Sequence, residues 1–220
     1  MTFQRARSDE QREVRRRAIL ETAAAMLAEM PVADLSLNEL SRRVGLAKSN
    51  VLRYFESREA VLLELLDDFL QKWLAELPGE LAAGIDAGRP AAQRAEQLAD
   101  VLSRSLAGRV VLCDLFGAQG GVLEHNVSAE VVRRHKRASH DSLARMVDLL
   151  RRHLPELGDG TQTTCLQALI MAGALSTYCS PSASVLAVYQ AEPELALLHT
   201  DLRTALRLGI VTGILGTLPR

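Results

Sequence analysis

The chain has 220 residues, of which 48% are apolar and 24% are charged, close to the average of globular domains. This composition excludes a disordered chain, a collagen-like repeat and a disulfide scaffold, and the length fits one or two ordinary domains. The net charge of −1 points to neither a nucleic acid nor a membrane as partner. Ala and Leu are abundant while aromatic residues make up only 4%, which favours an all-α fold.

No run of 18 apolar residues is present, and the charged N-terminus does not resemble a signal peptide. The three cysteines, Cys113, Cys165 and Cys179, are odd in number and far apart in the chain. Reduced thiols in a reducing compartment explain this pattern best, so we expect a cytoplasmic protein.

The first predicted helix runs from about Glu10 to Glu29 and ends before Pro31. Its apolar residues recur on one face, and Arg12, Arg15 and Arg16 lie mainly away from that face. Six arginines precede residue 18, and an N-terminal arm of this kind can follow a phosphate backbone or enter a minor groove. Taken alone, such a run is more often a solvated helix face.

The second predicted helix begins with the clearest start signal in the chain. Ser36 is placed to cap the amide of Glu39, and the Glu39 side chain to reach back to the Ser36 amide, as in a capping box. Leu35 and Leu40 occupy the two positions of a hydrophobic staple. Gly45 ends this short helix, because glycine adopts the left-handed conformation without strain.

The remaining elements also follow a helical spacing. A third helix is predicted from about Ala47 to Tyr54, and Ser57 caps a fourth that runs to about Leu77, where Pro78 and Gly79 close the first block. Further helices are predicted at about 91–107, 109–117, 129–153, 162–178 and 199–217, with a short piece near 182–190. The chain is therefore expected to form nine to ten helices.

Two short helices joined by a glycine turn have the length and break of a helix-turn-helix. Residues 46, 51 and 55 are apolar and are expected to face the other helices, which leaves Lys48, Ser49, Asn50 and Arg53 on the opposite side. These side chains donate to phosphates and base edges. Residues 1–58 carry eleven Lys and Arg against eight Asp and Glu, a net charge of +3, while the remainder carries −4. A plain αα corner is the alternative for the motif alone.

The region from Ile19 to Leu66 resembles the DNA-binding domain of the tetracycline-repressor (TetR/AcrR) family of bacterial transcriptional regulators. The helix spacing, the glycine, Tyr54-Phe55 and the run from Ser57 to Glu59 all fall in place together. The resemblance implies an N-terminal arm and helix-turn-helix domain over residues 1–60, linked through the helix at about 58–77. It implies a helical ligand-binding and dimerisation domain over residues 61–220, where only the layout is similar.

The resemblance implies a role for each matching position. The N-terminus of the second helix and the start of the fourth would meet phosphates, and the third helix would lie in the major groove. The implied DNA-binding residues are Ser36, Ala47, Lys48, Ser49, Asn50, Arg53, Tyr54 and Arg58.

Two positions depart from the family pattern. Family members usually carry Ser or Thr where Ala47 stands, so the third helix lacks a side-chain cap worth about 0.5–2 kcal/mol. They usually carry Tyr where Leu52 stands, so one hydroxyl contact is missing, and Arg53 is the nearest substitute.

Aromatic and sulfur-containing side chains are the candidates for an effector pocket. Core packing is their default explanation, but the family layout also places them near a cavity for a small hydrophobic or amphipathic molecule. The candidates are Phe69, Trp73, Phe116, Met146, Met171 and Tyr178. The helices near 162–178 and 199–217 are rich in small residues, and the resemblance implies that they form a homodimer interface. Ordinary packing within one chain is the alternative.

No catalytic residue, metal site or cofactor is predicted. The five histidines show no metal-ligand spacing, and Ser139, His140 and Asp141 are sequence neighbours. Adjacent helical side chains point about 100° apart, so these three form no triad among themselves. The basic run at 133–137 is interpreted as a solvated helix face, with a second DNA contact as the alternative.

The leading hypothesis is a ligand-responsive transcriptional repressor. It would bind a near-palindromic double-stranded operator as a homodimer and be released by a small-molecule effector. The alternatives are an all-helical small-molecule-binding protein or enzyme without a DNA role, and a helical adaptor that binds protein through its dimer face.

Overall fold

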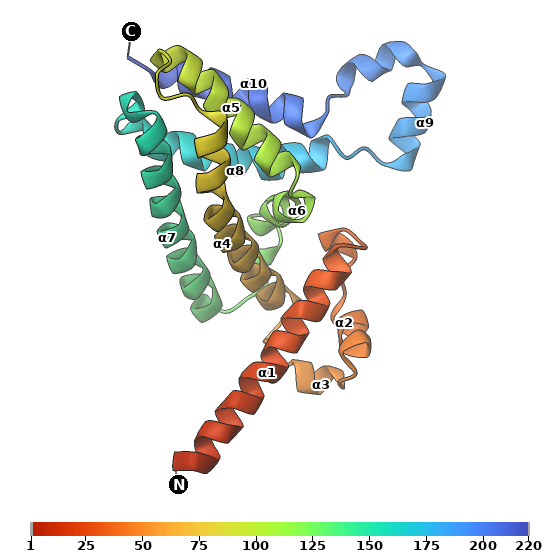
Figure 1. Cartoon of the computed structure of the whole chain (residues 1–220). Helices are drawn as coiled ribbons and strands as arrows, with labels where there is room; N and C mark the ends of the chain where they lie inside the picture. The colour runs from red at the N-terminus through yellow and green to blue at the C-terminus, as the bar shows by residue number, and fades with distance from the viewer. Residues whose placement is uncertain (1, 220) are drawn as a thin grey trace.

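The computed structural model describes residues 2–219, and the side chains of residues 10–197 and 199–219. Within this part of the chain it contains ten α-helices, four short 3-10 helices and no strand (Figure 1). The prediction of an all-α fold with nine to ten helices is confirmed.

The N-terminal block packs three helices around a small apolar core. It comprises α1 (Thr2–Leu27), the 3-10 helix η1 (Val32–Asp34), α2 (Leu37–Val44) and α3 (Lys48–Val51). Ile19 and Met26 of α1 have no exposed surface, and neither have Leu35 and Leu40 at the start of α2. The predicted staple residues are thus both in the core, where burial of each leucine contributes about 1.5–3 kcal/mol.

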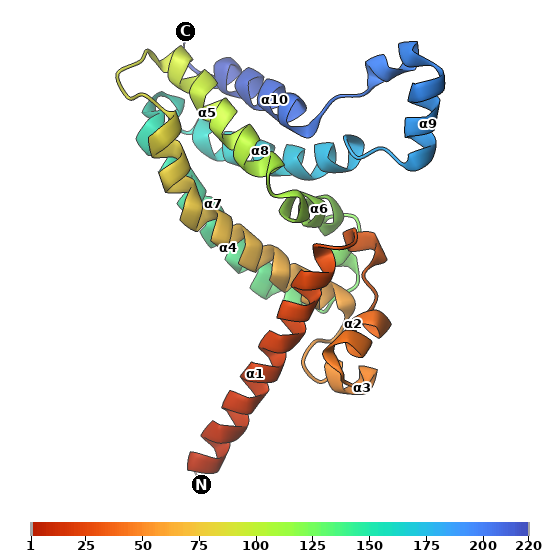
Figure 2. The ribbon, with the colours of Figure 1, turned by 45° about the vertical axis from the view of Figure 1, so that its right-hand side comes forward.

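The first helix is longer than the sequence predicts, because it begins at Thr2 rather than near Glu10. No Pro or Gly interrupts residues 2–10, so nothing in the chain stops the helix from extending. The predicted arm is therefore part of α1, whose N-terminal end points away from the body of the molecule (Figures 1 and 2). The side chains of Arg5 and Arg7 lie outside the described residues.

The fourth helix also exceeds its prediction. α4 spans Arg58–Gly84, with Pro78 inside it, so the expected end near Leu77 is wrong. A proline within a helix costs about 3 kcal/mol, because it removes one hydrogen bond and crowds the preceding turn. Leu74, Leu77 and Leu81 around it are all buried, and their combined burial exceeds that cost.

The C-terminal helices follow the predicted order. α5 (Ala91–Ala107) and α7 (Ala129–His153) have the predicted bounds, and the others differ by at most three residues. The rest are α6 (Val110–Gln119), η2 (Leu123–His125), η3 (Pro155–Leu157), α8 (Gly160–Tyr178), α9 (Ala183–Ala191), η4 (Pro193–Leu198) and α10 (Leu202–Thr217).

The C-terminal block is a bundle in which α10 packs on α5 and α8, α6 on α8, and α4 on α7 (Figure 2). α9 and η4 project sideways from it, and α9 has no buried residue (Figure 1). Among the described residues, no single helix is long and apolar enough to cross a membrane. α8 and α9 pass that test only as a pair, which is bent by 69°.

Candidate nucleic-acid interface

The turn between α2 and α3 is set by a cap at each side. Ser36 accepts a hydrogen bond from the Glu39 amide at 3.2 Å and so begins α2 as predicted. Gly45 ends it with φ 74° and ψ 27°, a left-handed conformation that strains any residue with a Cβ. α3 then starts at Lys48, three residues later. The predicted glycine-turned pair of short helices is present, although α3 ends at Val51 instead of Tyr54.

The two faces of α3 divide as the sequence predicts. Val51 and Phe55 are buried against the rest of the N-terminal block. On the other side Ala47, Lys48, Ser49 and Arg53 are exposed and Asn50 is partly exposed. Ala47 caps α3 without a side-chain hydrogen bond, as its methyl group requires. The outward face of α3 is therefore polar, cationic and open to a ligand.

A carboxylate cluster neutralises the arginines at the end of α2. Glu39 accepts hydrogen bonds from Arg42 at 2.6 and 2.9 Å and from Arg43 at 2.8 Å, and Arg43 also donates to Glu29 at 2.6 Å. The hydrogen bonds from Arg42 and Arg43 lower the pKa of Glu39 to about 2. The predicted return contact from Glu39 to the Ser36 amide is wrong, because two guanidinium groups are the stronger partners.

Arg58 lies against the protein at the start of α4. Its Nη2 donates to the backbone oxygen of Val32 at 2.8 Å, while the Val32 amide donates to the Asp114 carboxylate on α6 at 2.8 Å. The Arg58 Nε is buried without a partner. These contacts tie η1 to α4 and α6, so Arg58 holds the N-terminal block in place, and its expected phosphate contact stays a prediction.

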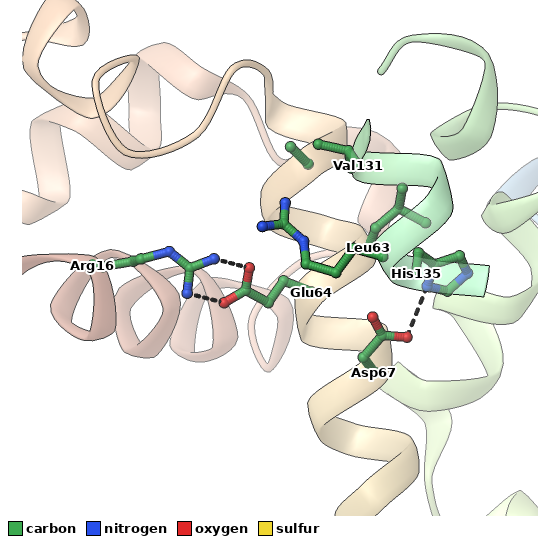
Figure 3. Close-up of a pocket in the computed structure, with 8 residues that line it drawn as sticks. Arg16, Leu63, Glu64, Asp67, Val131 and His135 are labelled. Atoms are coloured by element: carbon green, nitrogen blue, oxygen red, sulfur yellow. Dashed lines mark hydrogen bonds and ion pairs between the residues drawn. The ribbon is translucent and has the colours of Figure 1, made fainter. Parts of the chain in front are cut away.

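A second polar junction joins α1 to α4 and α7 (Figure 3). Arg16 of α1 forms a two-bond ion pair with Glu64 of α4, and its guanidinium lies 4.8 Å from the centre of the Phe55 ring. One turn further along α4, Asp67 meets His135 Nδ1 of α7 at 2.7 Å. The two pairs line a cavity of about 360 Å³ between these helices.

His135 corrects the interpretation of the basic run at 133–137 as a solvated face. Its side chain is buried, whereas Arg133, Arg134, Lys136 and Arg137 are exposed. Val131, His135, Ser142, Met146 and Leu150 recur at helical spacing along the buried face of α7, a signal that the sequence already contained.

The structure does not bring the six effector-pocket candidates into one site. Trp73 and Met146 are buried in the core, Tyr178 is largely exposed, and Phe69, Phe116 and Met171 are partly buried. The Trp73 indole donates to Ser105 Oγ at 2.8 Å, which satisfies its polar atom. Three cavities stand out beside α1, and none of the six residues lines them. Their ligand role stays a prediction.

Comparison with known proteins identifies the family. Residues 19–65 match the family model of bacterial regulatory proteins of the tetR family, and residues 67–220 match that of the tetracyclin repressor-like C-terminal domain. The chain belongs to the tetR family. Both blocks described above are therefore tetR-family domains, and the family resemblance inferred from the residues around α2 and α3 is confirmed.

Curated relatives of this tetR-family chain match its N-terminal part. The HTH-type transcriptional regulator EthR of Mycobacterium tuberculosis is 42% identical over 67 residues, which cover 28% of this chain and 31% of EthR. EthR of Mycolicibacterium smegmatis is 36% identical over 58 residues, covering 26% of this chain and 27% of that protein. The match thus spans about a third of the length of these relatives.

Among solved structures, the fatty acid degradation regulator FadR from Bacillus halodurans is similar over the whole tetR-family fold. It covers 92% of this chain and 98% of its own, with a TM-score of 0.51 and 13% sequence identity. Identity at that level supports the shared fold and nothing finer. The family and these relatives are transcriptional regulators.

Proposed function

We propose that the protein is a ligand-responsive transcriptional repressor that binds a near-palindromic operator as a homodimer. The observation that carries the proposal is the outward face of α3, where Lys48, Ser49, Asn50 and Arg53 stand on a helix whose other side is buried. Neither Lys48 nor Arg53 has an ion pair or hydrogen bond with another described side chain. Their charge is available to an external anion.

The geometry supports a role for α3 as the recognition helix. Its N-terminal residues would enter the major groove, where Lys or Arg donates to guanine and Asn makes two hydrogen bonds with adenine. The first amides of α2, beside Ser36, would face a phosphate. Ala47 precedes α3 and Tyr54 follows it, so these two residues flank the reading residues in the chain. A DNA role would require the protein to be in the cytoplasm with the chromosome.

A second copy of the chain would supply the other recognition helix. α8 and α10 pack on each other and expose large apolar side chains, which are Leu166, Ile170, Leu208 and Leu215. Exposed apolar side chains on two adjoining helices favour an interaction surface. Pairing these helices across a two-fold axis would place two α3 helices on successive half-sites.

The path from an effector to DNA would run through α4. This helix is continuous from Arg58 to Gly84, so it touches the recognition block at one end and the C-terminal bundle at the other. Arg16 with Glu64 and Asp67 with His135 attach it to α1 and α7. A small hydrophobic or amphipathic effector that favours another setting of α4 would lower operator affinity by shifting the population.

Operator selection tests the proposed function. The full chain is incubated with a pool of genomic fragments that includes the DNA flanking its own gene, and the retained sequence is titrated by fluorescence anisotropy at fixed salt. Lys48→Ala is expected to weaken binding roughly tenfold or more, because it removes one groove contact. Arg152→Ala, an exposed cation at the far end of α7, is the matched control.

Two outcomes would overturn the proposal. One is a wild-type chain that retains no fragment above random duplex, which would favour a small-molecule-binding protein or an adaptor. The other is a Lys48→Ala variant that binds the selected sequence as tightly as Arg152→Ala does.

A further inference from the structure

A surface hollow of about 370 Å³ separates the N-terminal half of α1 from the end of the recognition helix. It is lined by Gln11, Arg12 and Arg15 of α1 and by Arg53 and Tyr54, which follow α3. Residues 11, 12 and 15 share one side of a helix because 3.6 residues make a turn. The hollow therefore joins two segments that are nearly 40 positions apart in the sequence.

The charge of this hollow is unbalanced. Three of its five lining residues are arginines, and no carboxylate lines it. Arg12, Arg15 and Arg53 make no ion pair or hydrogen bond with any described side chain. Like charges gathered in this way repel one another, and an anion bound between them removes that repulsion.

Other arginines of the same block lie beside carboxylates. Arg16, one position after Arg15, is paired with Glu64, and Arg43 is paired with Glu39 and Glu29. On the opposite side of α1, Arg17 has no ion pair with a described side chain either, but the hollow that it lines also contains Glu13 and Glu21. The side of α1 that faces Arg53 therefore differs from the opposite side in having cations and no carboxylate around its hollow.

We propose that this hollow binds the phosphodiester backbone of duplex DNA, so that α1 acts as a sequence-independent clamp beside the groove that α3 reads. The proposal rests on the proposed function, since α3 sets where the duplex lies. Arginine guanidinium groups bind phosphate oxygens through paired hydrogen bonds. The Gln11 amide and the Tyr54 hydroxyl supply neutral donors of the kind that also contact phosphates.

The location of the hollow supports DNA over a free anion. Arg53 and Tyr54 continue the chain directly from α3, so an anion held by them lies at the edge of the recognition surface. α1 continues past the hollow to Thr2, away from the body of the molecule (Figures 1 and 2). A helix placed in this way can follow a backbone that runs beyond the half-site.

Phosphate contacts and base contacts have different signatures in a titration. A phosphate contact changes affinity equally for all sequences and adds about 0.9 to the slope of log affinity against log salt. A base contact changes the preference for one sequence over another. The role assigned to α1 can thus be separated from that of α3.

The test compares Arg12→Ala/Arg15→Ala with Arg17→Ala, which removes a cation from the opposite side of the same helix. Each variant is titrated with operator duplex and with scrambled duplex between about 50 and 200 mM salt. The double variant is expected to lose affinity about tenfold for both duplexes, with a slope smaller by about 1–2 and an unchanged ratio between them. Arg12→Lys/Arg15→Lys should retain the slope, because the charge remains.

Duplex length separates the DNA backbone from a free phosphate ion as the source of the anion. A duplex trimmed to the half-sites should lower wild-type affinity toward that of the double variant and leave the double variant unchanged. If trimming the duplex lowers the affinity of the wild type and of the double variant by the same factor, the hollow binds a free anion and the clamp proposal is wrong. The clamp proposal is also wrong if the double variant binds DNA as tightly as Arg17→Ala does. A wild type that binds operator and scrambled duplex equally would instead contradict the proposed function itself. Circular dichroism and melting verify that each variant is folded.

Discussion

At the scale of single residues, the three helix starts around the recognition unit differ in one respect. Ser36 caps α2 and Ser57 caps α4 through hydrogen bonds of 3.2 and 3.1 Å to the amides of residues 39 and 60. α3 begins at Ala47, which has the extended backbone of a cap, φ −63° and ψ 144°, but no side-chain oxygen. The recognition helix thus has the weakest start of the three.

Adding the missing oxygen should stabilise the fold. Ala47→Ser places a hydroxyl near the Asn50 amide, and we expect the free energy of unfolding to rise by about 0.5–2 kcal/mol in urea titrations. Ser36→Ala removes an existing cap and should lower it by a similar amount. A neutral effect of Ala47→Ser beside a costly Ser36→Ala would show that backbone geometry alone maintains the start of α3.

At the scale of elements, α6 and α8 cross where two glycines meet. A Cβ added at Gly173 would lie 2.6 Å from the Gly117 nitrogen and 2.7 Å from the Phe116 carbonyl carbon. Both neighbours are backbone atoms, so neither moves without displacing its helix. The contact explains why this pair of helices approaches so closely in the bundle.

Gly173→Ala should therefore destabilise the protein by about 1–3 kcal/mol, the usual cost of overpacking. Gly79→Ala is the matched control, since Gly79 lies inside α4 and its added Cβ meets nothing within 4 Å. There alanine should add about 0.5–1 kcal/mol, because glycine is a poor helix former. Thermal melting of both variants gives the comparison, and equal melting temperatures would contradict the tight crossing.

Some helix bounds could be predicted from the sequence and others could not. Local signals such as Ser36, Gly45 and Ser128 act within a few residues, so the bounds of α2 and α7 could be predicted from them. The continuation of α4 through Pro78 depends on leucines that distant helices bury. A rule based on neighbouring residues alone does not include the free energy of that burial. Trp73 is similar, because its spacing predicts an inward face but cannot identify Ser105 as its partner.

At the scale of the whole molecule, the charge of the N-terminal block is distributed more sharply than its total indicates. The net +3 of residues 1–58 spreads over eleven cations in the sequence. In the structure, Arg16, Arg42 and Arg43 are neutralised by carboxylates. Arg12, Arg15, Lys48 and Arg53 form no ion pair with a described side chain, and no carboxylate lines the hollow that contains three of them. Arg17 also has no such ion pair, but it lines a hollow together with Glu13 and Glu21. A count of charged residues does not include ion pairs between distant residues. These pairs concentrate the positive potential on the side of the block where α1 faces Arg53.

Dimerisation depends on apolar side chains that α8 and α10 expose together. Ile170 and Leu208 are 68% and 66% exposed on α8 and α10, and a large apolar side chain gains about 1.5–3 kcal/mol when water is removed from it. If this face joins two protomers, a carboxylate on each helix places buried like charges opposite one another across the two-fold axis.

Ile170→Glu/Leu208→Glu should therefore sediment as a monomer at micromolar concentration, while the wild type sediments as a dimer. Val110→Glu, at a 59% exposed position on α6, is the control and should remain dimeric. Operator affinity of the monomer should fall steeply, because one protomer covers only one half-site. A double variant that stays dimeric would move the interface away from α8 and α10, and a monomeric wild type would remove the geometric basis for a palindromic operator.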